Sequence, residues 1–357
     1  MRVAIVGAGL LGRLLAWRLL QQDFQITLYE AGDFLKPRSA AQTAAAMISP
    51  YSELLVTNKT IFAIGRQSLE LWPRWIQTLN QQPGNNKPLV TYANPGTIAV
   101  AHSQDQSELQ QFNRDLQSLL GQENDSVYLT RDALLSREAE LFQFQHGLYL
   151  PDEAYLDNRQ LLQNLFVTIK QLHGKCIDHT PLDTLASQDN SAVLSEFDCI
   201  IDCRGFGAKK DLPGLRGVRG EVMWVHCPEV QFQHAVRLLH PRYKLYLVPK
   251  PNHHYIIGAT EIESEDLSPL SVQSNLELAS ALYSIHPAFA EARIIETDVN
   301  LRPAFVDNEP KVIVDNNIIH LNGLHRHGFL LAPTLVEDVV SYLGDREPSR
   351  FWRYFLQ

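Results

Sequence analysis

The stretch Arg2-Val3-Ala4-Ile5-Val6-Gly7-Ala8-Gly9-Leu10-Leu11-Gly12 decides the fold. Val3–Val6 is a short continuous apolar run, which is typical of a strand buried in a parallel sheet. The glycines follow directly, and leucines at helical spacing come after them. A second apolar strand, Gln25–Tyr29, ends at Glu30. This order of elements predicts a βαβ unit that binds a dinucleotide.

The glycines and the acidic residue of this unit each have a physical task. Gly7 makes the tight turn, Gly9 lets the backbone approach a pyrophosphate, and Gly12 permits close packing of helix against strand. The helix N-terminus offers free N–H groups to the phosphates. Glu30 can accept hydrogen bonds from ribose hydroxyls, which disfavours a 2′-phosphate. The alternative is a Rossmann unit that binds nothing.

Length and charge exclude several classes of protein. A chain of 357 residues is long enough for two domains. Its 31 Lys and Arg against 40 Asp and Glu give a net charge of −9 without a basic stripe, so neither nucleic acid nor an anionic membrane is an expected partner. No signal peptide precedes the first strand, and no apolar stretch reaches the roughly 20 residues of a membrane span. We therefore expect a soluble cytoplasmic protein.

The dinucleotide unit is interrupted after its second strand. A helix rich in Ile, Leu and Trp follows, with a break expected at Pro73, and the loop Gln81–Lys87 is a plausible domain crossing. A buried strand near 198–202 resumes the unit, and alternating strands from Val218 onward indicate a second, antiparallel sheet. We expect an α/β (α+β) fold with a Rossmann-like FAD-binding domain (1–80, 146–215 and 315–357) interleaved with a substrate domain on a mainly antiparallel sheet (81–145 and 216–314).

The glycine motif itself does not choose between NAD and FAD. A simple NAD dehydrogenase would continue βαβαβ without pause, whereas this interleaving suits a flavoprotein. The run Asn322–Pro333 supports that interpretation, because Gly323 and Gly328 allow the backbone to approach a flat ligand. A helix N-terminus predicted at about Pro333 would direct its positive end at an anionic flavin ring. The alternative is an ordinary glycine-bounded loop.

Four segments together resemble the D-amino acid oxidase superfamily of FAD-dependent oxidoreductases, and most closely the bacterial glycine oxidases of the thiamine-biosynthesis type. They are the GxGxxG motif with Glu30, Ala44–Pro50 with Glu53, Leu245–Lys250 leading to Ile257–Thr260, and Leu301-Arg302-Pro303 with the 323–333 run. They span almost the whole chain in the family's order.

The resemblance implies non-covalent FAD and assigns residues to two groups. Arg302 would pair with the substrate carboxylate as a bidentate fork, helped by Tyr246 and Arg326. The alternatives are an ion-pair partner for either arginine and a half-buried sheet aromatic for Tyr246. The residues expected to contact FAD, mostly through backbone groups, are Gly7, Gly9, Leu10, Leu11, Gly12, Glu30, Ala31, Ala40, Ala41, Ala45, Ala46, Met47, Ile177, Gly205, Leu324, His325, Arg326, His327, Gly328, Phe329 and Leu330.

The sequence departs from the family pattern in three places. Ala46 stands where a glycine is usual before the methionine, His325 replaces a tyrosine, and His327 follows Arg326. These changes lie where the substrate is expected, so they bear on glycine as the substrate. The histidine pairs lack ligand spacing, so no metal is expected. No cysteine lies between Arg302 and Phe329, so no covalent flavin link is expected there.

The implied reaction is hydride transfer from a neutral amine to the flavin, which needs no protein acid or base, so no catalytic residue is named. Water would hydrolyse the imine to a 2-oxo acid and ammonia, and oxygen would become hydrogen peroxide. The candidate substrates are glycine, sarcosine or a small D-amino acid. Members of the family form homo-oligomers, although nothing in this sequence indicates an oligomeric state. The alternatives are an FAD-dependent amino acid dehydrogenase, an NAD(P)-dependent oxidoreductase and a non-enzymatic flavin-binding protein.

Overall fold

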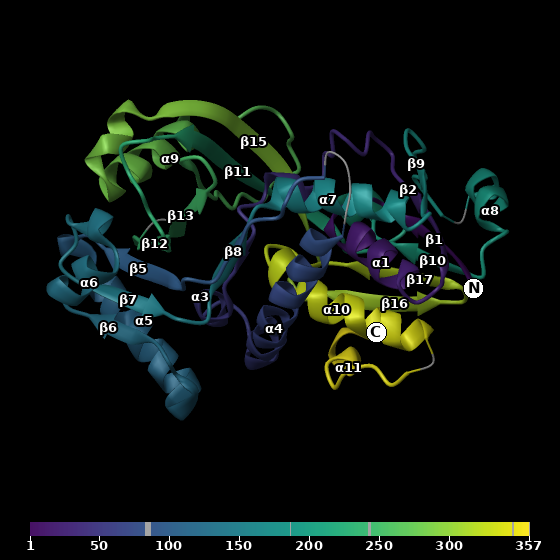
Figure 1. The fold of residues 1–357 in the computed structure, drawn as a ribbon, viewed down its shortest axis with the longest axis horizontal. Helices are drawn as coiled ribbons and strands as arrows, with labels where there is room; N and C mark the ends of the chain where they lie inside the picture. Colours follow the sequence, from purple (N-terminus) through teal and green to yellow (C-terminus); the bar gives the residue numbers. More distant parts are fainter. Residues whose placement is uncertain (83–86, 186, 242–243, 345, 357) are drawn as a thin grey trace.

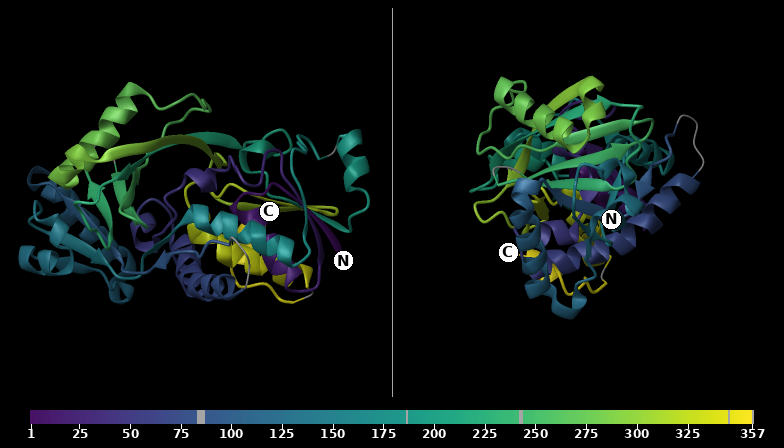
Figure 2. Two further views of the ribbon diagram at one scale, coloured as in Figure 1. Left: turned by 45° about the horizontal axis from the view of Figure 1, so that its top comes forward. Right: turned by 90° about the vertical axis from the view of Figure 1, so that its left-hand side faces the viewer.

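The structure is a computed structural model that describes residues 1–82, 87–185, 187–241, 244–344 and 346–356. It has two lobes along its long axis, each built on its own sheet (Figure 1). The chain passes between the lobes several times, as the colours in Figure 1 and in the left-hand view of Figure 2 show. The N-terminus lies at the outer end of the first lobe.

The first lobe contains a six-stranded sheet in the order β16-β17-β10-β1-β2-β9. Its strands are β1 (Arg2–Val6), β2 (Gln25–Tyr29), β9 (Lys175–Ile177), β10 (Cys199–Asp202), β16 (Lys311–Asp315) and β17 (Ile318–Asn322). All pairs are parallel except β16 with β17. The dinucleotide unit therefore resumes after an interruption, as the sequence predicted.

Helices with leucine-rich faces cover this sheet and form the largest apolar core. They are α1 (Leu10–Leu20), α4 (Lys59–Gln81), α7 (Asn158–Gln171) and α10 (Gly328–Leu343). Asp157 begins α7 as predicted, because its Oδ1 accepts a hydrogen bond of 2.8 Å from the amide of Gln160. Shorter helices are α2 (Ala40–Thr43), α3 (Pro50–Leu54), α8 (Gln188–Leu194) and α11 (Trp352–Phe355).

The second lobe contains an eight-stranded sheet in the order β15-β11-β14-β13-β12-β5-β7-β6. Its strands are β5 (Thr97–Ala101), β6 (Val127–Leu129), β7 (Gly147–Leu150), β11 (Arg216–His226), β12 (Ala235–Leu239), β13 (Lys244–Lys250), β14 (His254–Gly258) and β15 (Arg293–Ala304). Among the described strands of this second sheet, only β12 and β5 pair in parallel. The expected mainly antiparallel sheet is therefore confirmed.

The limits proposed for the two domains differ from this topology in two elements. Strand β16 belongs to the first sheet, although residues 311–314 fall within the range 216–314 assigned to the substrate domain. Strand β7 belongs to the second sheet, although its residues fall within the range 146–215 assigned to the first domain. A three-stranded sheet of β3 (Met47–Ile48), β8 (Ala154–Leu156) and β4 (Tyr92–Ala93) connects the lobes. Residues 83–86 of the predicted crossing loop lie outside the described residues.

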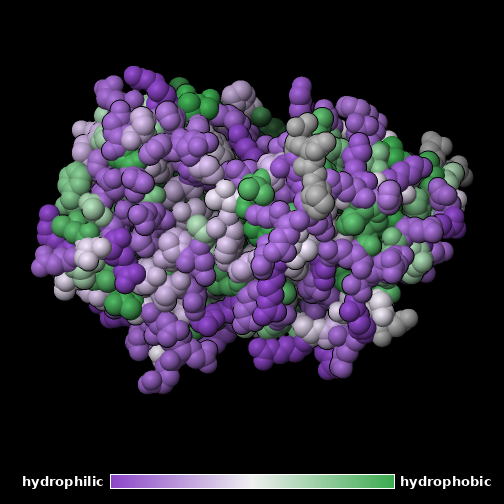
Figure 3. All heavy atoms as spheres, viewed as in Figure 1, coloured by the Kyte–Doolittle hydropathy of each residue, from purple (hydrophilic) through white to green (hydrophobic). Residues whose placement is uncertain are grey.

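Helices also cover the second sheet, and they bury two further apolar clusters against it. They are α5 (Gln106–Leu120), α6 (Arg131–Arg137) and α9 (Val272–Ile285). On the face shown in Figure 3, polar side chains predominate and apolar ones lie in small groups. Within the described ranges, no helix is both long and apolar enough to cross a membrane.

Pro73 and Pro333 lie inside helices, and at both positions the predicted helix limit was wrong. Helix α4 continues through Pro73 without a break, and α10 begins at Gly328, five residues before Pro333. Proline has no N–H to donate to the carbonyl four residues earlier. In α10 that carbonyl belongs to Phe329, and the indole N–H of Trp72 on α4 binds it at 2.9 Å. The partner lies on a distant segment, so local sequence could not reveal it.

Candidate functional site

A continuous cavity of about 1100 Å³ lies between the two sheets. One end is lined by the glycine loop after β1, and the other by side chains from the second sheet, among them Tyr246 and Arg302. The volume is at the upper end of the roughly 300–1,000 Å³ common for small-molecule sites. The cavity can therefore hold an extended ligand together with a small second molecule.

The glycine loop is built so that no side chain could replace its first and last glycines. Gly7 has φ +98°, and a Cβ there would lie 2.6 Å from the carbonyl oxygen of Cys203. A Cβ on Gly12 would lie 1.9 Å from the carbonyl oxygen of Gly7. Gly12 does not line the cavity; it allows α1 to approach β1.

Glu30 lies beside this loop at the end of β2. Its Oε2 accepts a hydrogen bond of 2.8 Å from the amide of Ala8, and its Oε1 accepts one of 3.1 Å from Gly32. Ile177 does not line the cavity; instead its carbonyl accepts a hydrogen bond of 2.9 Å from the amide of Glu30. The position of Ile177 therefore supports Glu30 rather than a ligand.

Sequence reasoning missed Arg13, which holds the loop from behind. Arg13 is fully buried and donates to the carbonyls of Ala8, Phe34 and Leu162 at 2.7, 2.8 and 2.7 Å. Burial lowers its pKa to about 10, so it remains charged at neutral pH. An arginine one residue after the glycine motif, on a helix whose only other charged residue is Arg18 in its last turn, was the available signal.

The remaining predicted cofactor residues line the cavity along its middle. They are Gly9, Leu10, Leu11, Ala31, Ala40, Ala41, Ala45, Ala46, Met47, Gly205 and residues 324–330. Ala46 has φ +56°, a conformation that glycine adopts more easily. This conformation gives a physical reason for the glycine that the family pattern implies at this position.

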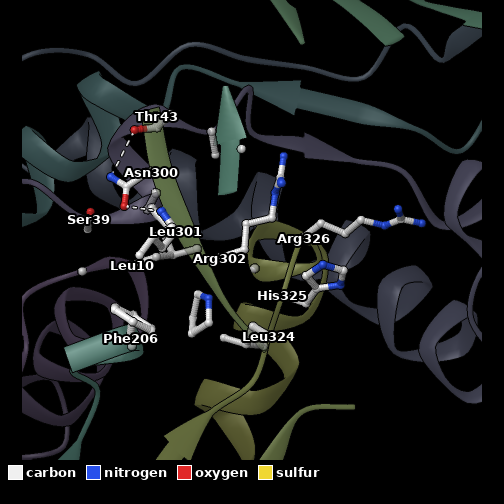
Figure 4. A pocket seen from close by; sticks show the side chains of 18 of the residues that line it. Leu10, Ser39, Thr43, Phe206, Asn300, Leu301, Arg302, Leu324, His325 and Arg326 are labelled. Carbon is white, nitrogen blue, oxygen red and sulfur yellow. Dashed lines mark hydrogen bonds between the residues drawn. The ribbon is translucent and has the colours of Figure 1, made fainter. Parts of the chain in front are cut away.

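Arg302 on β15 extends into the cavity (Figure 4). Its Nη1 donates to the carbonyl oxygens of Thr260 at 3.0 Å and Arg219 at 3.4 Å, and no carboxylate among the described residues is paired with it. A Cβ on Gly220 would lie 2.5 Å from its guanidinium. Gly220 therefore makes room for a guanidinium that has no counter-ion of its own.

Arg326 is placed differently from Arg302. Figure 4 shows the two side chains pointing in different directions. Arg326 pairs with Glu53 at 2.7 Å and with Glu261 at 2.8 Å. Burial alone would raise the pKa of Glu53, but Arg326 and its neighbours outweigh it and lower that pKa to about 2. The structure thus gives Arg326 the ion-pair role that the sequence left open as the alternative.

Two histidines flank Arg326 in the cavity wall. Burial, with smaller contributions from nearby cations, lowers the pKa of His325 to about 3. Burial also lowers the pKa of His327 to about 4, although the negative charge of Glu53 opposes it. Both rings are therefore neutral at physiological pH. Across the described residues, no group of three or more His, Cys, Asp or Glu could hold a metal ion.

The chain matches the family model described as "DAO: FAD dependent oxidoreductase" over residues 2–340. It belongs to this family of FAD-dependent oxidoreductases. A putative thiamine biosynthesis oxidoreductase ThiO of Rhizobium etli is 36% identical over 96% of each chain. The glycine oxidase of Geobacillus kaustophilus is 23% identical over 98% of this chain and 94% of its own. These matches confirm the resemblance and make the chain an oxidoreductase that acts on amino acid or amine donors.

Solved structures of the family share the fold. The crystal structure of the Geobacillus kaustophilus glycine oxidase superposes with a TM-score of 0.84 at 19% identity, covering 100% of this chain and 98% of that one. The iminodiacetate oxidase of Chelativorans sp. BNC1 gives a TM-score of 0.81 at 19% identity over 99% and 98%. At these identities the likeness shows the fold alone.

The glycine-loop end of this FAD-dependent oxidoreductase fits its dinucleotide cofactor. A Cβ on Gly9, the residue before α1, would meet only the Cβ of Ser39, at 3.5 Å. The hydroxyl of Ser39 is buried without a partner in the described structure. Free amides at the start of α1 and an unpartnered hydroxyl are donors suited to a pyrophosphate.

Proposed function

We propose that this oxidoreductase oxidises a small amino acid or amine whose carboxylate pairs with Arg302, and that it transfers the electrons to oxygen. A primary amino acid, water and oxygen would give a 2-oxo acid, ammonia and hydrogen peroxide; from sarcosine the released amine would be methylamine. Glycine, sarcosine and small D-amino acids are the candidate substrates. The name of the Rhizobium etli relative supports a role in thiamine biosynthesis, and within it we propose the synthesis of the thiazole.

The observation that carries the proposal is the guanidinium of Arg302, which faces the cavity without a carboxylate partner among the described residues. A guanidinium binds a carboxylate through two parallel hydrogen bonds, which fix its orientation as well as its position. Bound FAD supplies a two-electron acceptor. Arg302 would hold the substrate against it, so that positioning contributes much of the rate.

Tyr246 on β13 would complete the carboxylate site. Its side chain lines the cavity, and burial raises the pKa of its phenol. The hydroxyl is therefore protonated at neutral pH and can donate a hydrogen bond. With His325 and His327 neutral, the nearby imidazoles add no positive charge to disfavour a substrate amine.

The test is an anaerobic absorbance titration of the purified flavoprotein with a panel of amines, followed by admission of oxygen. We expect bleaching by a small amino acid and stoichiometric peroxide on reoxidation. Arg302→Met should raise KM by about 100-fold or more, because it removes one partner of a largely desolvated ion pair, while FAD stays bound. Arg302→Lys should recover only part of the loss. An unchanged KM in Arg302→Met would show that the carboxylate binds elsewhere, and reduction without peroxide would show a dehydrogenase.

A further inference from the structure

A second arginine of the second sheet reaches the same cavity. Arg237 lies on β12, whose other residues, Ala235, Val236, Leu238 and Leu239, are all apolar and at most 4% exposed. Arg237 itself is 7% exposed and lines the cavity. A buried charge on an interior strand is costly unless it is paired. Neither the sequence analysis nor the proposed reaction uses this residue.

The described partners of Arg237 leave most of its guanidinium N–H donors without a hydrogen bond. Its one hydrogen bond among the described residues runs from Nη1 to Oε1 of Glu53, at 3.4 Å, and its buried Nε has no partner. Oε2 of Glu53 is already bound more closely, at 2.7 Å, by Arg326. A guanidinium has five N–H donors, so most of those on Arg237 remain available.

A second buried carboxyl group near Arg237, that of Glu153, is hydrogen-bonded to another residue. Glu153 accepts hydrogen bonds from the amide and hydroxyl of Ser52 at 2.6 and 3.0 Å. Burial raises its pKa to about 7, so it carries only part of a negative charge at neutral pH. Glu153 therefore does not supply the counter-ion that Arg237 lacks.

The sheet places Arg237 and Arg302 on two sides of Tyr246. In the β12–β13 register Arg237 is directly opposite Tyr246, and Arg302 lies on β15 at the edge of the same sheet. Four strand spacings of about 4.8 Å separate β12 from β15, roughly 19 Å. Arg302 reaches back over Gly220 on β11, which shortens the distance between the two guanidiniums. Two guanidiniums that line one cavity on either side of Tyr246 suit a small molecule with an anionic group at each end.

We infer that the substrate is an amino acid with a second carboxylate, one carboxylate pairing with Arg302 and the other with Arg237. This inference rests on the proposed function and narrows its substrate class, because glycine and sarcosine have one carboxylate and would not be the preferred substrates. The second carboxylate can be attached through the α-carbon side chain, as in aspartate, or through the nitrogen, as in iminodiacetate. Both present the same chemistry to Arg237.

Binding without turnover provides the first test. The oxidised holoenzyme is titrated with malonate, succinate and glutarate and with their half-amides, following the perturbation of the flavin spectrum. We expect each fitting dicarboxylate to bind at least tenfold more tightly than its half-amide. Arg237→Met should bring that ratio to within threefold of one, and Arg237→Lys should restore part of it. Arg66→Met, which removes the same charge from the partly exposed end of α4, is the control and should keep the wild-type ratio.

Turnover measurements then show whether the second carboxylate is attached through the side chain or through the nitrogen. D-aspartate is compared with D-asparagine, and iminodiacetate with N-(carbamoylmethyl)glycine, by kcat/KM. A preference for the dicarboxylate in one pair, lost in Arg237→Met, identifies the attachment. Equal binding of dicarboxylates and half-amides, or a preference that survives Arg237→Met, overturns the inference, while the proposed oxidation of an amino acid with one carboxylate is untouched. If no amine reduces the flavin and no monocarboxylate perturbs it, the proposed function itself fails.

Discussion

The two ends of the cavity recognise their ligands by different means. The glycine-loop end uses backbone geometry. Gly7 and Gly12 permit contacts that no other residue would, and Arg13 links the Ala8 carbonyl of the loop to the carbonyls of two other segments. The opposite end uses charged side chains from separate strands and loops, with Arg326 and Glu53 paired and Arg302 without a carboxylate among the described residues. Backbone recognition fixes a cofactor common to the family, whereas side-chain recognition can change with the substrate.

The largest expected effect separates folding from cofactor binding within the glycine loop. Gly12→Ala should prevent stable folding, because its Cβ would meet the carbonyl of Gly7 at 1.9 Å. Gly9→Ala should fold, since its Cβ would meet only Ser39 at 3.5 Å, but should lose FAD affinity because the methyl occupies the pyrophosphate approach. Thermal unfolding and the ratio of flavin to protein absorbance check both variants. Equal behaviour of the two would contradict this division of roles.

At the charged end, Glu53→Gln should cost about 3 kcal/mol of stability at neutral pH, the order of magnitude that corresponds to a carboxyl pKa lowered from 4.5 to about 2. A lowered carboxyl pKa stabilises the fold above pH 4.5, and that contribution is lost as the pH falls towards 2. Urea unfolding of wild type and variant from about pH 7 to about pH 2 measures it. The difference between them should shrink over that window; a constant difference would show that charge is not its cause.

A smaller effect is expected where the backbone supports the charged end. Gly220→Ala should displace the Arg302 guanidinium and raise the KM for a carboxylate substrate by about tenfold, an estimate from the roughly 1–3 kcal/mol typical of overpacking. FAD content should not change. Displacement of FAD from Gly220→Ala would mean that this residue serves the cofactor instead.

The smallest expected effect is a change in stability at Ala46, which lines the cavity between its two ends. Ala46→Gly should stabilise the protein by up to about 1 kcal/mol, because glycine adopts φ +56° without the steric cost of a Cβ. The gain is partly offset by the greater freedom of glycine in the unfolded chain. Thermal unfolding of the apoprotein measures the net change. A marked loss of stability would show that the Ala46 methyl group contributes more through packing than it costs in strain.

What the sequence predicted well was local. The glycine motif, Glu30 and the cap at Asp157 depend on neighbours a few residues away, so spacing alone indicates them. The predicted start of α10 was wrong. Pro333 leaves the carbonyl of Phe329 without its helical partner, and Trp72, about 260 positions earlier, binds that carbonyl instead. The pairing of Arg326 with Glu53 and Glu261 joins three distant segments, which one sequence does not bring together. Arg237 did carry a signal, a lone charge in an apolar strand, that was not used.

The order of strands in the first sheet also has a consequence for biosynthesis. Strand β1 pairs with β10, and β10 pairs with β17, which ends at Asn322. At roughly 5–20 residues per second, a ribosome needs roughly 15–60 s to reach that point. Strand β1 has both its neighbours, β2 and β10, once Asp202 is made, but the other edge of β10 stays unpaired until β17 follows, and an unpaired strand edge invites wrong partners. Translation therefore delivers the parts of the FAD site at its beginning but completes the site only near its end.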